Sequence, residues 1–240
     1  MAIGQPTRGV IWVAGASSGI GAAIARRLSA EGYTVAASAR RSARLRVLAR
    51  SYPSLHAFPC DCADADAVRR TVEALEERFG AIRALIHCVG TALFKPFLDI
   101  SPEEFAELIR HNLWSTFLCT RAVLPGMLHQ QQGIVVAIGS VASLKAFPRS
   151  SAYGGLKAAV AQMLRALREE VRPHGVKIIN VHVGATETPL WPATMRRRWR
   201  AQMLLPDDVA KTIASLLTLA SNPQLLPEEL VLRPQLGDLP

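Results

Sequence analysis

The feature that most constrains the fold is a regular alternation of short apolar runs with longer segments of helical periodicity. Short apolar runs predict buried strands, and apolar residues repeated every three to four positions predict amphipathic helices. Such alternation favours a parallel sheet whose crossovers place helices on both faces. We therefore predict a doubly wound α/β/α fold of about seven strands. Strands are expected at 9–14, 33–39, 55–60, 81–88, 133–138, 176–181 and 229–232, and helices at 18–30, 42–51, 63–79, 102–128, 151–172 and 206–220.

Length and local signals favour a single domain over residues 1–240. The chain has 240 residues, half of them hydrophobic, which is enough for one large α/β domain and too few for two. Ser101 and Asp207 each precede a helical pattern and are expected to be N-caps. Gly80 and Gly175 are expected to end helices.

The sequence indicates a cytoplasmic protein without a membrane span. Its first residues lack a charged segment followed by an apolar one, so no signal peptide is expected. The longest uncharged stretch, 122–144, is interrupted by proline, glycine and glutamine and is not a membrane span. The four cysteines have no disulfide-framework spacing and are expected to be buried free thiols of a reducing compartment. Neither they nor the six histidines form a zinc pattern, and no metal site is expected.

The net charge of +9 comes mostly from arginine. The densest basic run is 196–200, Arg-Arg-Arg-Trp-Arg, in which an aromatic residue lies among arginines. Such a run could bind nucleic acid or a polyphosphate, or it could be the solvated face of a helix or a lid. Because no nucleic-acid module accompanies the run, we expect no nucleic-acid partner.

A glycine-rich turn, Gly15-Ala-Ser-Ser-Gly19-Ile-Gly21, joins the first expected strand to the first expected helix. Glycines let the backbone approach a pyrophosphate, and the N-terminus of the helix supplies N–H groups and a favourable dipole. The spacing differs from G-x-G-x-x-G and from the P-loop. The turn therefore predicts a dinucleotide site, while a tight turn without a ligand is the alternative.

Ser140, Tyr153 and Lys157 form the strongest candidate for chemistry. Ser140 follows a buried strand, at the edge where open α/β sheets bind their ligands. Tyr153 and Lys157 are four residues apart at the start of a helix and share one face. A nearby cation favours the phenolate and lowers the pKa of a tyrosine, which is near 10 in water. Ser140 could then hold a carbonyl oxygen that Tyr153 protonates; an exposed Tyr and Lys without function is the alternative.

Together these motifs resemble the short-chain dehydrogenase/reductase family. The family's nucleotide motif is T-G-x-x-x-G-x-G, and its catalytic signature is S-x12-Y-x3-K; both fit here, with Ala14 in place of the threonine. The family's catalytic asparagine corresponds to Asn112 in His111-Asn-Leu-Trp. The resemblance covers nearly the whole chain and implies a single NAD(P)-binding, Rossmann-like domain.

The resemblance also implies a reaction, the reversible reduction of a ketone or aldehyde to an alcohol by hydride transfer. By this likeness the chain is a carbonyl reductase or alcohol dehydrogenase. Ser140 and Tyr153 would hold the substrate oxygen, and Tyr153 would donate or accept the proton. Lys157 would lower the pKa of Tyr153 and bind the nicotinamide ribose, and Asn112 would anchor a water.

The end of the second expected strand indicates NADP(H) as the cofactor. NAD-dependent relatives place an acidic residue there, whereas this chain has Ala39-Arg40-Arg41. A guanidinium can hold a phosphate with two parallel hydrogen bonds. We expect Arg40 to be the main contact with the 2′-phosphate and Arg41 to assist it; the alternative is that the pair caps a helix or faces solvent.

Further cofactor contacts follow from the resemblance alone. Two of the family's motifs are altered here: N-N-A-G is His87-Cys88-Val89-Gly90, and P-G is Val183-Gly184. With these changes noted, the expected contacts besides the two arginines are Gly15, Ser17, Ser18, Gly19, Ile20, Gly21, Asp61, Cys62, Val89, Gly90, Tyr153, Lys157, Gly184, Thr186 and Thr188.

The substrate is less constrained than the cofactor. Residues 187–205 are expected to form a lid, and the apolar character of the residues expected around the pocket suits a small hydrophobic carbonyl compound. The arginines of 196–200 could instead meet an acyl carrier, although the chain lacks the Gly-rich tail typical of 3-ketoacyl reductases. A non-catalytic NADP(H)-binding regulator is a further alternative, and a homodimer or homotetramer is expected from relatives. The expected pocket residues are Leu93, Phe94, Leu144, Phe147, Leu190, Trp191 and Met195.

Overall fold

The structure is a computed structural model, and it describes residues 9–239. Residues 1–8, to which the expectation about a signal peptide refers, lie outside the described residues. None of the helices described in 9–239 is long and apolar enough to cross a membrane.

Seven parallel strands form one sheet in the order β3-β2-β1-β4-β5-β6-β7. From β1 the chain adds strands first on one side (β2, β3) and then, from β4, on the other side. This change in strand order makes the sheet doubly wound, as predicted. Every residue of the central strand β1 is buried, because helices cover both faces of a parallel sheet. The strands are β1 Val10–Ala14, β2 Val35–Ser38, β3 Leu55–Ala57, β4 Ile82–His87, β5 Gly133–Ser140, β6 Val176–Val183 and β7 Glu229–Leu232.

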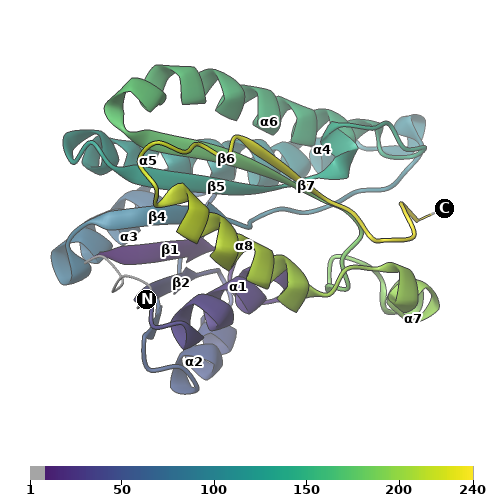
Figure 1. Cartoon of the computed structure of the whole chain (residues 1–240). Coiled ribbons are helices and arrows are strands. Elements are labelled where there is room, and N and C mark those ends of the chain that lie inside the picture. The colour runs from purple at the N-terminus through teal and green to yellow at the C-terminus, as the bar shows by residue number, and fades with distance from the viewer. Residues whose placement is uncertain (1–8, 240) are drawn as a thin grey trace.

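Helices cover both faces of the sheet (Figure 1). Helices α1, α2 and α8 contribute to one hydrophobic cluster, and α3, α5 and α6 contribute to the other. Together with the sheet they make the three layers that the alternation of elements predicted. The helices are α1 Gly19–Ala30, α2 Ser42–Arg50, α3 Ala65–Phe79, α4 Pro102–Ile109, α5 Ser115–His129, α6 Ser151–Val171, α7 Ala193–Trp199 and α8 Pro206–Ala220.

Two helical segments differ from the prediction. The continuous helix expected at 102–128 is divided by a π-helical turn, Arg110–Trp114, into α4 and α5. Helix α7 lies inside the segment 187–205, for which only a lid was expected, and it extends away from the sheet (Figure 1). Its seven residues are too few for a periodic signal to identify.

The predicted helix ends were mostly right. Ser101 caps α4 through a capping box with Glu104, and Gly80 ends α3. Gly175 adopts a left-handed conformation and ends the short 3-10 turn that continues α6. The prediction for Asp207 was wrong: α8 begins at Pro206, and the carboxylate of Asp207 pairs with Arg26 of α1 at 3.0 Å. A proline fits the first turn of a helix because it has no N–H to donate.

The four cysteines are free thiols, as predicted, although Cys88 is only partly buried. Among the described residues, no group of histidine, cysteine and acidic side chains could hold a metal ion.

Candidate active site

A cavity of about 610 Å³ lies along the carboxyl ends of β1, β2, β4 and β5. This is the edge of the sheet where a doubly wound fold binds its ligands. Most of the predicted cofactor contacts line the cavity: Gly15, Ser17, Ser18, Gly19, Ile20, Gly21, Arg40, Arg41, Asp61, Cys62, Val89, Gly90, Tyr153, Lys157 and Thr188.

The glycine-rich turn forms one side of the cavity by close packing of main chain. Gly15 has φ +89°, and a Cβ at this position would lie 2.8 Å from the carbonyl carbon of Cys88 and from the nitrogen of Val89. No other residue type fits both the conformation and the space. The turn between β1 and α1 therefore lies directly against the end of β4.

Arg41, rather than Arg40, contacts the glycine-rich turn. Its Nη2 donates hydrogen bonds to the hydroxyls of Ser17 and Ser18, both at 3.0 Å. Arg40 lines the same cavity and is exposed. The guanidinium groups of Arg40 and Arg41 and the hydroxyls of Ser17 and Ser18 thus lie near the end of β2. Residues 39–41 include no carboxylate.

Asp61 follows β3 and is fixed from both sides. One carboxylate oxygen accepts from the Ala63 amide at 3.1 Å, and the other accepts from Arg110 Nη2 at 3.1 Å. Arg110 begins the π-helical turn, so this ion pair ties the loop after β3 to the α4–α5 junction. The neighbouring Cys62 is buried, and burial together with a hydrogen bond to Cys119 keeps the pKa of its thiol well above the usual value.

Ser140, Tyr153 and Lys157 lie together, as the spacing predicted. Ser140 is the last residue of β5, and the other two are buried near the start of α6. Lys157 Nζ is 5.8 Å from the centre of the Tyr153 ring. The three groups therefore face one another at the cavity edge.

Burial determines the acidity of both ionisable groups. Burial raises the pKa of Tyr153, and a hydrogen bond with Ser140 partly opposes this rise. Burial lowers the pKa of Lys157 to about 8. The direction for Tyr153 is opposite to the lowering predicted from the sequence, because the ammonium lies over the ring while the hydroxyl is desolvated.

Asn112 lies behind Lys157, in the π-helical turn. Its Nδ2 donates to the carbonyls of Leu108 at 2.9 Å and Thr91 at 3.1 Å, while its buried Oδ1 has no partner. A Cβ on Gly90 would lie 2.8 Å from this Oδ1 and 3.2 Å from Lys157 Nζ. Gly90 therefore gives room for both groups on the same side of the cavity.

His87 takes the place of the first asparagine in the family's N-N-A-G. Its Nδ1 lies 3.3 Å from the Thr116 hydroxyl, which donates to the Asn112 carbonyl at 2.6 Å. Burial and the charge of Lys157 lower the pKa of His87 to about 3, so the imidazole is neutral. It connects β4 to α5 without adding a charge near the lysine.

Four predicted site residues do not line the cavity. Ser140 and Asn112 are buried just behind the residues that line it. Gly184 packs against the segment after β7, where its amide donates to the Leu232 carbonyl at 2.7 Å. Thr186 is buried, and its hydroxyl donates to the Gly184 carbonyl at 3.0 Å.

Several cavity residues carried no sequence signal of their own. Most of them are small, or belong to strand ends whose side chains face either way depending on register. The sequence signal available for these residues was their position, because each of them lies beside a predicted contact or at the end of a strand. The cavity residues that the sequence did not predict are Ala39, Cys60, Cys88, Thr91, His111, Ile138, Gly139 and Pro189.

Of the seven predicted pocket residues, Leu190 lines this cavity. Phe94 and Trp191 lie next to it and contact each other: their rings stack at 5.3 Å with an interplanar angle of 13°. The Phe94 ring also meets Tyr153 edge to face at 5.6 Å. An aromatic pair therefore covers the tyrosine on the side of the lid.

Side-chain contacts fix the lid segment. Arg196 Nε donates to the Trp191 carbonyl at 3.2 Å, and Arg200 pairs with Glu187 at 3.0 Å. Arg196 of α7 and Arg200, which directly follows α7, thus help to hold the loop that carries Trp191, which is a structural role for part of the basic run.

Comparison with known proteins identifies the class that this fold and site define. The short chain dehydrogenase family model matches residues 9–199. The chain belongs to the short-chain dehydrogenase/reductase family of oxidoreductases. Sepiapterin reductase of Chlorobaculum tepidum is 30% identical over 241 residues, which cover 96% of this chain and 98% of the relative.

Solved structures of the family superpose over nearly the whole chain. An alcohol dehydrogenase of the archaeon Thermococcus sibiricus, complexed with 5-hydroxy-NADP, gives a TM-score of 0.87 at 28% identity and covers 97% of this chain and 99% of its own. A metagenomic short-chain oxidoreductase in complex with NADP gives 0.82 at 29% identity, covering 95% of this chain and 97% of its own.

Proposed function

We propose that this protein is an NADP(H)-dependent oxidoreductase that reversibly reduces a ketone or aldehyde to an alcohol. The observation that carries the proposal is the grouping of Ser140, Tyr153 and Lys157: Tyr153 and Lys157 line the cavity, and Ser140 ends β5 close to Tyr153. These are a hydrogen-bond donor, an acid and a cation within reach of one carbonyl group.

The residues of the cavity fit NADP(H). The main chain at Gly15 allows the close approach that a pyrophosphate needs, and α1 points its N-terminus at the same place. Ser17, Arg40 and Arg41 offer hydroxyl and guanidinium donors where a 2′-phosphate would bind. When bound, the nicotinamide cofactor supplies or accepts the hydride. Two relatives of known structure are complexed with NADP or a derivative of it.

Tyr153 acts as the acid in the direction of reduction. Its raised pKa keeps the proton on the phenol at neutral pH, ready for transfer to the oxygen of the reduced carbonyl. The oxygen of Ser140 accepts from the Ala142 amide at 3.1 Å, so its own proton is left to be donated, to the Tyr153 oxygen or, when substrate is bound, to the substrate oxygen. The two hydroxyls together stabilise the charge that develops on that oxygen.

Lys157 helps to return to Tyr153 the proton that the tyrosine loses in each turnover. Its pKa of about 8 lies close to neutral pH, so that both the ammonium and the amine are accessible. The unpartnered Oδ1 of Asn112 faces the same side of Gly90 as the ammonium, and a water there would link the two. These are proposed roles for Lys157 and Asn112.

The substrate is proposed to be hydrophobic. The stacked rings of Phe94 and Trp191 border Tyr153 on the lid side, and the exposed Leu190 and Leu144 lie on the loops nearby. Flat apolar groups stack well on such rings. We expect aryl or alkyl-aryl ketones and aldehydes to be preferred over short polar ones.

A carrier-linked 3-ketoacyl substrate is the second candidate. It is favoured by the exposed Arg197 and Arg198 on α7, for which the described residues provide no ion-pair partner. An acidic carrier could bind there and present its acyl chain to the cavity.

The first test is oxidation of NADPH, with NADH in parallel, against aryl ketones, aldehydes, β-keto esters and a 3-ketoacyl thioester. We expect turnover of at least one apolar carbonyl compound, faster with NADPH than with NADH. Preference for the thioester would favour the second candidate. Tight NADPH binding without turnover of any of these compounds would contradict the proposed enzymatic activity. It would favour a non-catalytic NADP(H)-binding regulator.

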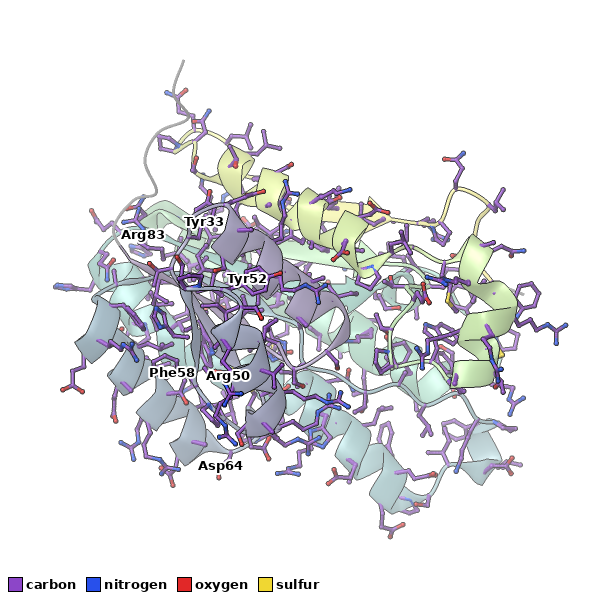
Figure 2. The ribbon with its side chains drawn as sticks, turned by 90° about the horizontal axis from the view of Figure 1, so that it is seen from below. Tyr33, Arg50, Tyr52, Phe58, Asp64 and Arg83 are labelled. Atoms are coloured by element: carbon purple, nitrogen blue, oxygen red, sulfur yellow. The ribbon has the colours of Figure 1, made fainter. Side chains whose placement is uncertain are left out.

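Tyr153→Phe tests the chemistry directly. Loss of the phenolic proton should reduce kcat by about 10²- to 10⁴-fold while NADPH binding, measured by fluorescence titration, is retained. Tyr33→Phe is the matched control. Tyr33 lies just after α1 (Figure 2), packs against the core, and its substitution should have no effect on turnover. A fully active Tyr153→Phe enzyme would refute the scheme.

We further propose assembly as a dimer or tetramer in the cytoplasm. Trp114 and Phe117 are exposed by 45% and 39%, and their rings stack at 5.4 Å on the outer face of the α4–α5 helix. A second copy would bury this apolar patch. Size-exclusion chromatography with light scattering on the protein and on its Phe117→Glu variant tests this; a monomer in both cases would contradict it.

A further inference from the structure

A second polar network lies behind the cavity, on the β7 side of Ser140. The hydroxyl of Ser143, in the 3-10 turn Val141–Ser143, lies 2.6 Å from the Ser140 carbonyl oxygen and 2.7 Å from His182 Nδ1. His182 belongs to β6, next to Gly139 in the sheet register, and is 1% exposed. Its Nε2 lies 2.8 Å from Glu229 Oε2 on β7.

Glu229 is held in its ionised form. Arg165 of α6 donates to both carboxylate oxygens, from Nε at 2.7 Å and from Nη2 at 2.8 Å, and Asn180 Nδ2 donates at 3.2 Å. These hydrogen bonds, chiefly that of Arg165, lower the pKa of Glu229 to about 2. At neutral pH the carboxylate can only accept, so Nε2 of His182 carries a proton.

The number of protons then decides the state of the other ring nitrogen. Ser143 has one hydroxyl proton and two close neighbours, the Ser140 carbonyl, which only accepts, and His182 Nδ1. If Nδ1 were bare, both neighbours would need the same proton. If Nδ1 carries a proton, it donates to Ser143, which donates to the Ser140 carbonyl, and all three short contacts are hydrogen bonds.

The network fixes the main chain on which Ser140 depends. Ser143 holds the Ser140 carbonyl, and the amide of Ala142, in the same turn, donates to the Ser140 hydroxyl oxygen at 3.1 Å. The carbonyl and the hydroxyl of Ser140 are therefore both hydrogen-bonded to residues 141–143. The orientation of this turn decides where the Ser140 hydroxyl proton points.

We propose that His182 is a positioning residue for Ser140: as an imidazolium paired with Glu229, it directs the Ser143 proton to the Ser140 carbonyl and so aims the Ser140 hydroxyl at the substrate. The inference rests on the proposed role of Ser140 in carbonyl reduction. Loss of the extra proton from His182 frees the Ser140 carbonyl, because Ser143 then donates to the imidazole.

The surroundings of His182 favour this role over others. Among the described residues, its one charged hydrogen-bond partner is Glu229; from α6, Arg165 and Arg168 reach that carboxylate, the latter at 3.8 Å. The turn 141–143 contributes no charged side chain. The order Ser143–His182–Glu229 is that of a hydrolase triad, but Ser143 does not line the cavity and its proton is directed to the main chain.

Two measurements test the proposal. The first is the ¹⁵N NMR spectrum of histidine-labelled protein at neutral pH, with His182→Gln used for assignment. We expect both ring nitrogens of His182 to be protonated. A neutral ring at neutral pH would overturn the proposal whether or not the protein is an active enzyme.

The second measurement is kcat and KM at neutral pH for wild type, Ser143→Ala and His182→Gln. Because small misplacements of catalytic groups cost up to about 100-fold, we expect kcat at neutral pH to fall by about 10-fold or more in both variants. The KM for NADPH should change less than about twofold. The double variant should be no worse than either single one.

Ser29→Ala is the matched control, because the buried Ser29 hydroxyl in α1 has no hydrogen-bond partner. It should leave both kcat and KM unchanged. An active wild type with unaffected Ser143→Ala would overturn the positioning role alone. An imidazolium in a wild type that reduces no carbonyl compound would overturn the proposed function and the catalytic part of this inference with it.

Discussion

The two sides of the active site are built from different materials. On the cofactor side the backbone packs closely: the turn at Gly15 lies against the main chain of Cys88 and Val89, and Gly90 lies against the side chain of Asn112. On the substrate side the surface is made of side chains, and Phe94 and Leu190 there are 39% and 46% exposed. The backbone determines the shape of the cofactor side, whereas the shape of the substrate side can change with each side-chain substitution.

The difference extends to how the two sides are held together. Close backbone packing depends little on pH or salt. The β6–β7 edge behind the substrate side relies on the charges of Arg165, Glu229 and Arg168. Substitutions should therefore act on the cofactor side through fit and phosphate charge, and on the substrate side through titration and selectivity.

The largest effect is expected at Arg41. If it holds the 2′-phosphate, Arg41→Ala removes a charge-assisted pair of bonds and should raise the Kd for NADPH by about 10- to 100-fold. The Kd for NADH should change little. Isothermal titration calorimetry measures both. Arg50→Ala is the control, since Arg50 lies at the other end of α2 (Figure 2) and does not line the cavity. A loss seen in Arg40→Ala but not in Arg41→Ala would restore the order of importance that the sequence predicted.

Gly90 and Gly155 test the idea that the cofactor side is closed by fit. A Cβ at Gly90 would lie 2.8 Å from Asn112 Oδ1, whereas one at Gly155 in α6 would meet nothing within 4 Å. Gly90→Ala should reduce the free energy of unfolding by about 1–3 kcal/mol. Gly155→Ala should raise it by about 0.5–1 kcal/mol, because alanine favours the helix. Urea denaturation distinguishes the two, and equal effects would contradict the distinction.

The same contrast explains what could be predicted from the sequence. Gly15, Gly19 and Gly21 have one use in that spacing, and the Ser140–Tyr153–Lys157 spacing follows from a strand end and one helical turn. The central strands were found because they are apolar runs in a buried parallel sheet, whereas β7 at the sheet edge is partly exposed. Local pattern and tertiary environment agree at these positions.

Other features depend on contacts between distant parts of the chain. The π-helical turn at Arg110–Trp114 changes the register of a helix whose sequence pattern gives no break, and Arg110 reaches back to Asp61. The pairing of Asp207 with Arg26 joins α8 to α1 across 181 residues. The raised pKa of Tyr153 follows from burial, which a spacing of four residues does not encode.

The β6–β7 edge should show the pH dependence that the cofactor side lacks. Glu229 has a pKa of about 2 in the folded protein against 4.5 ordinarily. A lowered pKa stabilises the fold fully above pH 4.5, and this contribution is lost as the pH falls from about 4.5 to about 2. Glu229→Gln should therefore lower stability at pH 7 by about 1–2 kcal/mol after allowance for partial exposure, and the difference from wild type should shrink over that window.

Urea unfolding at a series of pH values measures this difference. Glu228→Gln is the matched control, because Glu228 is 48% exposed and its contact with Arg168 is 3.5 Å. It should have a smaller effect at every pH. A difference between wild type and Glu229→Gln that stays constant from pH 7 to pH 2 would show that the carboxylate charge does not stabilise this edge.

The smallest effect is expected at Trp191, and it concerns selectivity. The stacked pair of Phe94 and Trp191 borders Tyr153 from the lid, and an aromatic contact of this kind contributes about 0.5–1.5 kcal/mol. Trp191→Ala should raise the KM for an aryl ketone by about two- to tenfold, because the substrate ring loses a stacking surface, and should change the KM for a short aliphatic ketone less. Trp199→Ala is the control on the same lid, since Trp199 contacts Arg198 and does not line the cavity. If the KM rises equally for both ketones, the aromatic pair stabilises the lid as a whole and does not select the substrate. The substrate side would then depend on close packing, as the cofactor side does.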